Sequence, residues 1–180
     1  MMPPLPALPA LAAGHGRAVL LDADGVISTI KPGTVARQVG ASIPLAIHVP
    51  ATLRRLGNPA IQLLDLLELF AFVHPAQSLA PTPAGLARAL EIPVPTSLDS
   101  AAQALPEMAE LLLTRLAAGK DTPANRDAPG LAARMGAAGW LWAPYVLNAL
   151  GQPDAKPDGI DLGELKKMQE HFRTNQPPQR

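Results

Sequence analysis

The sequence contains no cysteine, few aromatic residues and no excess of charge of either sign. Without cysteine, the chain can form neither a disulfide framework nor a thiolate zinc site, and it has no cysteine nucleophile. Fifteen basic residues balance fifteen acidic ones, so no overall field attracts the protein to nucleic acid or to an anionic membrane. This composition is typical of a cytoplasmic protein, in which any DNA binding must come from a local surface.

Long apolar runs are missing as well. No run reaches the roughly 18 to 20 residues that are needed to cross a bilayer. The proline-interrupted start, MMPPLPALPALAAGHG, has no basic region of the kind that opens a signal peptide. We therefore expect no membrane partner. The hydrophobic content of 48% is enough for one packed domain at a length of 180 residues.

The pattern of apolar and turn-forming residues predicts an α/β domain with a small sheet. Residues 18–22 and 26–30 are apolar, partly β-branched runs on either side of Ala-Asp-Gly. This arrangement is typical of an antiparallel hairpin in which Gly25 adopts positive φ. Residues 44–49 predict a further, buried strand. At least three strands are therefore expected.

The remaining apolar segments predict flanking helices and a helix-rich C-terminal half. Capping residues, prolines and glycines bound these segments, which are residues 51–57, 60–75, 82–92, 97–119 and 131–151. The longest of them, 97–119, is expected to kink or restart at Pro106. We interpret residues 1–16 as a proline-rich lead-in, 17–151 as the folded domain, and 152–180 as a linker or the truncated start of a following domain.

The most conspicuous chemical motif is Asp22-Ala-Asp24-Gly25, which follows an apolar run. It resembles the opening motif of haloacid dehalogenase phosphatases. In that superfamily the first Asp is a phosphoryl-accepting nucleophile, the second is a general acid/base, and both lie at the carboxyl end of a parallel strand near magnesium. The later Ser/Thr, Lys and acidic pair of those enzymes have no clear counterpart here. A hairpin turn with exposed aspartates explains the same residues.

Other candidate sites have ordinary structural explanations. Asp65 and Glu68 lie one turn apart and could be paired acids, but they also suit the start and face of a helix. His48 and His74 lie near prolines at the ends of elements, without the spacing of metal ligands. The chain also lacks a complete phosphate-binding loop. We expect no cofactor or metal on this chain.

A few side chains could form a surface for a partner or for DNA. Trp140 and Trp142 are two residues apart, so on one helix they would point to different faces. One tryptophan would then fill the core, and the other would cover a partner or stack on a base. The basic groupings are Arg54 with Arg55 and Lys166 with Lys167. Strong DNA binding is not expected from so few cations.

One long stretch carries a more specific resemblance. LLDLLELFAFVHPAQSLAPTPAGLARAL, residues 63–90, closely resembles a segment near the N-terminus of DinG-type ATP-dependent DNA helicases, relatives of the XPD helicases, as they occur in alphaproteobacteria. The likeness extends to LPALAAGHG before it and GWLWAP after it. In that family the N-terminal region resembles a DEDD-type 3′ to 5′ exonuclease with a ribonuclease-H-like fold. The resemblance therefore implies such a domain over residues 17–151.

The resemblance also implies that the nuclease chemistry is lost. Two-metal phosphodiester cleavage needs a cluster of carboxylates. The family's first-strand Asp-x-Glu is matched to Asp22 and Asp24, or the hairpin turn stands there instead. Its His-Asn-x-x-Phe-Asp is matched to a segment that keeps His48 but has Leu53 at the ligand position. Its His-x-Ala-x-x-Asp motif is matched by DSAAQA, residues 99–104, which lacks both the general-base histidine and the last ligand. The family's Asp-Thr-Leu-Glu-Leu is matched at residues 65–69, where its role is architectural.

The resemblance thus predicts a non-catalytic module that docks a partner or positions DNA. Its partner would be a helicase motor domain, in cis or as a split protein, with weak contact to single-stranded DNA. ATP and magnesium would be bound by that parent helicase and not by this chain. Two alternatives remain open from the residues: a phosphatase that uses Asp22 and Asp24, and a free-standing protein-interaction domain. This chain alone is not expected to be an enzyme.

Overall fold

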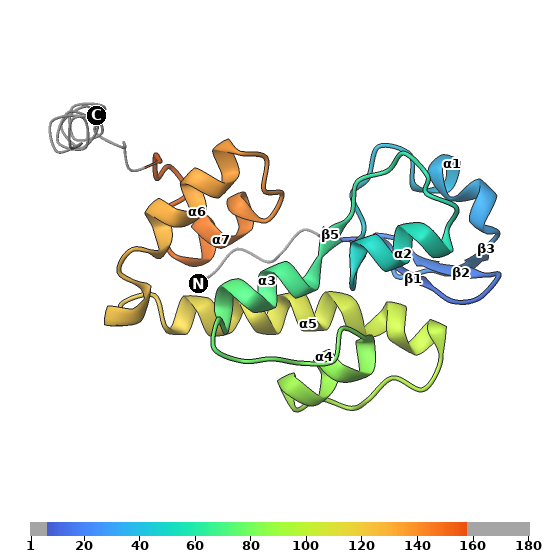
Figure 1. The fold of residues 1–180 in the computed structure, drawn as a ribbon, viewed down its shortest axis with the longest axis horizontal. Coiled ribbons are helices and arrows are strands. Elements are labelled where there is room, and N and C mark those ends of the chain that lie inside the picture. Colours follow the sequence, from blue (N-terminus) through green and yellow to red (C-terminus); the bar gives the residue numbers. More distant parts are fainter. Residues whose placement is uncertain (1–6, 158–180) are drawn as a thin grey trace, which may run out of the picture. The chain divides into compact units, whose positions relative to one another are not determined.

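The structure is a computed structural model that describes residues 7–157 (Figure 1). The chain divides into two compact units, Met1–Lys120 and Asp121–Arg180, each of which is described by itself. Lys166 and Lys167, one of the two basic groupings, lie outside the described residues. No helix within residues 7–157 is both long and apolar enough to span a bilayer.

The first unit is built on a five-stranded mixed sheet in the order β3-β2-β1-β4-β5. The strands are β1 (Ala10–Ala13), β2 (Ala18–Leu21), β3 (Ile27–Ile30), β4 (Leu45–Ala46) and β5 (Leu64–Asp65). β2 is antiparallel to both β1 and β3, whereas β1, β4 and β5 run parallel to one another. The predicted α/β class is confirmed, with more strands than the sequence pattern indicated.

The predicted hairpin is confirmed in detail. β2 pairs with β3 in the register Ala18 to Ile30 and Leu21 to Ile27, and Gly25 has a φ of 83°. Glycine reaches this backbone conformation without a steric penalty. The turn therefore depends on the residue that the sequence pattern identified.

The central strand of the sheet lies in the stretch that we interpreted as a lead-in. β1 occupies Ala10–Ala13 and pairs with β2 on one side and β4 on the other. Its sequence, ALAA, contains no β-branched or aromatic residue and so lacks the usual features of a strand. Pairing on both sides, rather than local preference, makes it a strand. Residues 10–13 are therefore part of the folded domain and not of a lead-in.

Seven α-helices are seen within the described residues, five of them in the first unit. These five are α1 (Val35–Val39), α2 (Val49–Arg55), α3 (Leu66–Val73), α4 (Pro83–Leu90) and α5 (Leu98–Ala118), and a 3-10 turn at Pro32–Thr34 precedes α1. The prediction for α4 is confirmed, including the Thr82 cap, whose hydroxyl accepts from the Gly85 N–H at 3.0 Å. α5 begins at a Ser97 capping box and runs unbroken through Pro106.

The segment expected to be one helix at 60–75 is instead a strand followed by a helix. β5 ends at Asp65, and α3 begins directly after it at Leu66. The Asp65 carboxylate accepts a hydrogen bond from the Leu67 N–H at 3.0 Å and so caps α3. An apolar run of this kind cannot separate a buried strand from a buried helix by periodicity alone.

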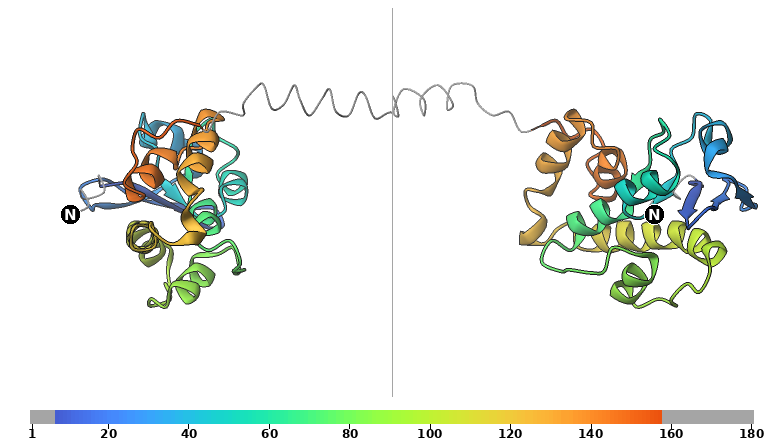
Figure 2. Two further views of the ribbon diagram at one scale, coloured as in Figure 1. Left: turned by 90° about the vertical axis from the view of Figure 1, so that its left-hand side faces the viewer. Right: turned by 45° about the vertical axis from the view of Figure 1, so that its right-hand side comes forward.

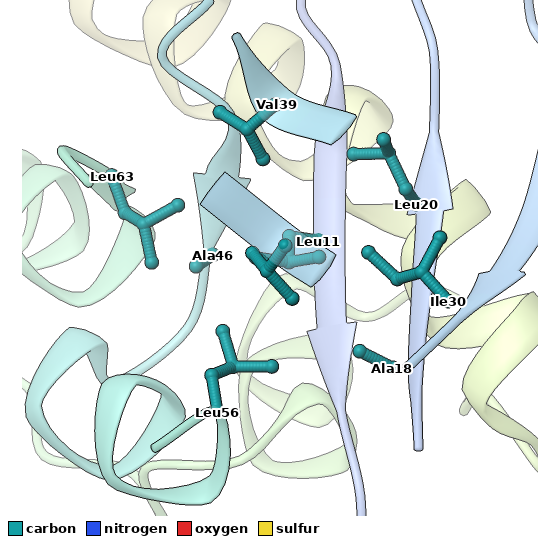
Figure 3. Close-up of a cluster of buried hydrophobic side chains, with 9 residues drawn as sticks. Leu11, Ala18, Leu20, Ile30, Val39, Ala46, Leu56 and Leu63 are labelled. Carbon is teal, nitrogen blue, oxygen red and sulfur yellow. The ribbon is translucent and has the colours of Figure 1, made fainter. Parts of the chain in front are cut away.

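Helices cover both faces of the sheet. On one face, side chains of β1 to β4 meet α1, α2 and the approach to β5 in a buried cluster formed by Leu11, Ala18, Leu20, Ile30, Val35, Val39, Ala46, Leu56 and Leu63 (Figure 3). α5 packs against β1, β2 and β4, and also against α3 and α4. Figure 2 shows α4 on the opposite side of α5 from α3. α5 therefore joins the sheet to the other helices of this unit.

A contact between α3 and α5 makes the unit sensitive to pH. The Arg115 guanidinium lies 3.4 Å from Nε2 of His74, at the end of α3. Burial, and secondarily the charge of Arg115, lower the pKa of His74 below its usual value of 6.5. The unfolded chain therefore takes up the proton at higher pH than the folded chain, so stability is lost as pH falls below about 6.5.

We expect His74→Gln to reduce this pH dependence. Glutamine keeps an acceptor for Arg115 but does not titrate, so urea midpoints measured at pH 7.5 and pH 5.0 should differ less in the variant than in the wild type. An equal loss of stability in both proteins on acidification would contradict the assignment to His74.

The described part of the second unit, residues 121–157, holds two helices, whereas the segment 131–151 predicted one. A 3-10 turn at Pro123–Asn125 leads into α6 (Ala128–Ala137) and then α7 (Ala143–Ala149). Gly139, with a φ of 99°, lies between them, and a residue in this conformation interrupts a right-handed helix. The predicted single helix over 131–151 is therefore wrong, and both tryptophans lie at the break.

Candidate functional site

Asp22 and Asp24 belong to the tight turn of the hairpin. Oδ1 of Asp22 accepts hydrogen bonds from the backbone N–H groups of Asp24 and Val26, each at 2.9 Å. The Gly25 N–H donates to the Asp22 carbonyl at 3.1 Å. Asp24 is exposed. These bonds make Asp22 a turn-forming residue, and they give no indication of a phosphoryl-accepting site.

The direction of β2 also separates these aspartates from the parallel part of the sheet. Leu21 pairs with Ala10, so Asp22 follows β2 at the edge where β1 begins. The carboxyl ends of β1, β4 and β5 lie at the opposite edge. Asp22 is therefore not at the carboxyl end of a parallel strand but in the hairpin turn, which was the alternative to its match with the first-strand Asp-x-Glu. β1, the first strand of the described residues, contains no acidic residue.

Mutations of Asp22 and Asp24 test whether Asp22 stabilises the turn. Asp22→Ala removes the acceptor of two backbone N–H groups, and we expect it to lower the free energy of unfolding by about 1 kcal/mol. Asp24→Ala, a neighbouring change at an exposed residue, should alter it by less than about 0.5 kcal/mol. Urea denaturation of both variants measures this difference, and equal effects would contradict the assigned turn role.

The carboxyl edge of the parallel strands is organised by a buried carboxylate, Asp65, which is 7% exposed. Its Oδ1 accepts from the N–H groups of His48 at 3.1 Å and Leu67 at 3.0 Å, and its Oδ2 accepts from Val49 at 2.9 Å. These donors belong to the segment after β4 and to the start of α3. Asp65 therefore joins two neighbouring strand ends.

His48 is also used structurally at this edge. It adopts a left-handed conformation with a φ of 57°, and its Nδ1 accepts a hydrogen bond from the Ala51 N–H at 3.1 Å to cap α2. The two matched ligand positions are apolar. Leu53 packs against the buried cluster of the sheet, and Ala104 lies on α5 and lines a separate pocket with residues 92–96. Asp99 is exposed in the first turn of α5.

No candidate metal cluster is found in the part of the chain that the structure describes. Within residues 7–157, no three His, Asp or Glu side chains are grouped so that they could hold an ion. At the carboxyl edge, Asp65 is committed to backbone donors. Within residues 7–157, the parallel strands therefore end without a group of three potential metal ligands.

An aliphatic cavity occupies this edge instead. It has a volume of about 280 Å³ and is walled by Leu11, Ala12, Ala13, Ile47, Leu98 and Leu105. Its polar side chains are His15, Thr52 and Arg55. The Thr52 hydroxyl donates to the Ile47 carbonyl at 3.0 Å, and Nη1 of Arg55 donates to the Ala13 carbonyl at 3.3 Å. We call this space the edge cavity.

Sequence reasoning did not find the edge cavity. Of its lining residues, only Arg55 had been singled out. The others come from four separate regions, which are the end of β1, the segment from β4 into α2, the start of α4 and the first half of α5. The only sequence signal for the cavity was the run of alanine and leucine before Gly14. This run predicts a cavity wall only once it is known that β1 is a paired strand.

The candidate surface residues fall into two groups. Arg54 and Arg55 are exposed at the end of α2, and no ion pair joins either to a carboxylate within residues 7–157. Trp142 is fully buried and packs edge-on against Tyr145, with ring centroids 5.7 Å apart. It is therefore a core residue and not a surface for DNA or a partner. Trp140 is half-buried.

Comparisons of the chain with protein-family models, curated proteins and solved structures gave no match. The proposed function of the chain therefore rests on the geometry at the turn of the β2–β3 hairpin and at the carboxyl edge of β1, β4 and β5.

Proposed function

We propose that the chain is a non-catalytic, exonuclease-like N-terminal domain of an ATP-dependent DNA helicase, serving as a docking or substrate-positioning module. The observation that carries the proposal is the carboxyl edge of β1, β4 and β5. A nuclease of the resembled kind would gather carboxylates at this edge around two metal ions. This chain has an aliphatic cavity there, with Asp65 turned to the backbone.

The sheet supports the ribonuclease-H-like part of the proposal. The resemblance implies a mixed sheet that opens with a hairpin and is flanked by helices. The first unit has an antiparallel meander, β1 to β3, extended by two parallel strands, with helices on both faces. This arrangement favours the exonuclease-like assignment over the phosphatase alternative, which needs its nucleophile at the end of a parallel strand.

The lost ligands favour a binding role over a catalytic one. Asp65 offers a carboxylate at the right edge, but both of its oxygens accept backbone N–H groups. The matched ligand positions at Leu53 and Ala104 have no oxygen to offer. A fold that keeps its sheet without these ligands can still present a surface. In this proposal, ATP and magnesium are bound by a motor domain in cis or in a separate chain.

Reading the encoding DNA beyond codon 180 and into the adjacent frames tests the helicase assignment. We expect a Gly-x-x-x-x-Gly-Lys-Thr loop followed by an Asp-Glu-Ala-His-like box, because a motor domain needs both to bind ATP and magnesium. Finding neither motif, in the same frame or in a neighbouring one, would contradict the helicase assignment. The protein-interaction alternative would then account for the chain.

A further inference from the structure

We propose that the edge cavity binds a partner peptide in which a leucine-sized aliphatic side chain lies next to a carboxylate. This inference rests on the docking role proposed above and assigns that role a place and a chemistry. The aliphatic side chain would enter between the end of β1 and the start of α5, and the carboxylate would meet Arg55 at the rim.

The walls of the cavity determine what can enter it. Leu11, Ile47 and Leu105 are almost fully buried, and Leu98 is half-exposed at the opening. The space of about 280 Å³ is large enough for one branched aliphatic side chain together with part of its backbone. Burying such a side chain removes its apolar surface from water, which favours binding. An apolar group is therefore the best match for the interior.

The rim determines the charge of the peptide. Arg55 uses Nη1 to donate to the Ala13 carbonyl, which leaves further N–H donors of its guanidinium for another acceptor. Exposed His15 also borders the cavity, and no acidic side chain lines it. Because no described carboxylate pairs with Arg55, a ligand carboxylate is the complementary group.

The lining favours a peptide over single-stranded DNA. Proteins that hold single strands combine aromatic rings, on which bases stack, with a positively charged groove. The edge cavity has no Phe, Tyr or Trp in its lining, and Arg54 and Arg55 are the only neighbouring cations on α2. A short peptide needs no aromatic stacking and only one charge contact. The aliphatic walls and the Arg55 guanidinium can supply both of its contacts.

Three capped pentapeptides test the proposal by NMR titration of the full chain. The probe is Gly-Asp-Leu-Asp-Gly; Gly-Asn-Leu-Asn-Gly removes the carboxylates and Gly-Asp-Gly-Asp-Gly removes the aliphatic side chain. We expect the probe to shift the amide signals of Gly14, His15 and Arg55, and each altered peptide to bind at least fivefold more weakly. Equal binding of all three would overturn the proposal.

Neighbouring arginines supply the matched protein variants. Arg55→Gln should weaken binding of the probe at least fivefold, whereas Arg54→Gln, an exposed change beside the cavity but not in its lining, should change it less than twofold. Both variants should keep the dispersed spectrum of the wild type because neither side chain is buried. Equal losses in the two variants would overturn the proposal.

A ten-nucleotide thymidine oligonucleotide is the competing ligand in the same titration. Tighter binding of the oligonucleotide than of the probe, with shifts at the same amides, would overturn the peptide assignment and leave DNA as the ligand of the cavity. Failure of the peptide test is separate from failure of the helicase assignment, because the latter depends on the motor motifs in the encoding DNA.

Discussion

Replacing Asp65 with alanine is expected to lower the free energy of unfolding by about 3 to 4 kcal/mol. The substitution leaves the N–H groups of His48, Val49 and Leu67 without their acceptor at a buried position. Each unsatisfied buried donor costs about 1 to 3 kcal/mol, and part of this cost is relieved when the segment relaxes toward water. Urea denaturation followed by circular dichroism gives the value.

Asp65→Asn provides a graded comparison for the same site. An amide keeps one oxygen, which can still accept from two of the three N–H groups, so we expect a loss of about 1 to 2 kcal/mol. Asp99→Ala is the matched control, because Asp99 is an exposed aspartate in the first turn of α5, and its loss should cost less than about 1 kcal/mol. Equal effects at Asp65 and Asp99 would show that the carboxylate does not organise the strand ends.

Gly85→Ala is expected to destabilise the first unit by about 2 to 4 kcal/mol, although alanine is the better helix former by about 1 kcal/mol. Gly85 is buried in the first turn of α4, where a Cβ atom would overlap the carbonyl oxygen of Ala80. Because this oxygen belongs to the backbone, a side-chain rotation cannot relieve the overlap. The loop before α4 would have to move, and with it the Thr82 cap.

Gly33→Ala is the matched control for Gly85→Ala. A Cβ at Gly33 would meet no atom within 4 Å, so we expect a change within about 0.5 kcal/mol. Thermal unfolding of the two variants, prepared side by side, measures the difference. If Gly85→Ala melts with the wild type, α4 does not approach Ala80 as closely as the structure shows.

The elements that sequence patterns predicted are those with local determinants. The hairpin has a glycine at the turn and β-branched residues in β3, and α4 and α5 have the Thr82 and Ser97 caps with apolar residues at helical spacing. Caps and turns act within a few residues of the chain. The elements that they start or join can therefore be predicted from the sequence without knowledge of tertiary contacts.

The elements that were missed depend on distant partners. β1 is a run of alanine and leucine that becomes a strand only through pairing on both sides, and β5 is two residues long. β4, also two residues long, lies within the strand predicted at 44–49. The break at Gly139 divides a segment whose apolar spacing suits one helix. Local propensity is a weak guide where pairing and packing decide the structure.

The candidate site was not predicted from the sequence; only some of the residues near it were singled out. The apolar residues at Leu53 and Ala104 indicated from sequence that ligands were missing. The position of Asp22 at the wrong sheet edge followed from the direction of β2, which cannot be known before β1 is recognised. The expected place of Asp65 at the start of a helix is confirmed by its cap on α3. Its bonds to His48 and Val49 were hidden, since these residues are more than fifteen positions away.

The measurement that tests the central claim most directly is a nuclease assay on the purified chain. A single-stranded oligonucleotide labelled at its 5′ end is incubated with magnesium or manganese and followed on a denaturing gel. We predict that the oligonucleotide stays at full length with either metal, because no three potential metal ligands are grouped within residues 7–157. Metal-dependent shortening from the 3′ end that is abolished by Asp65→Asn would contradict the claim.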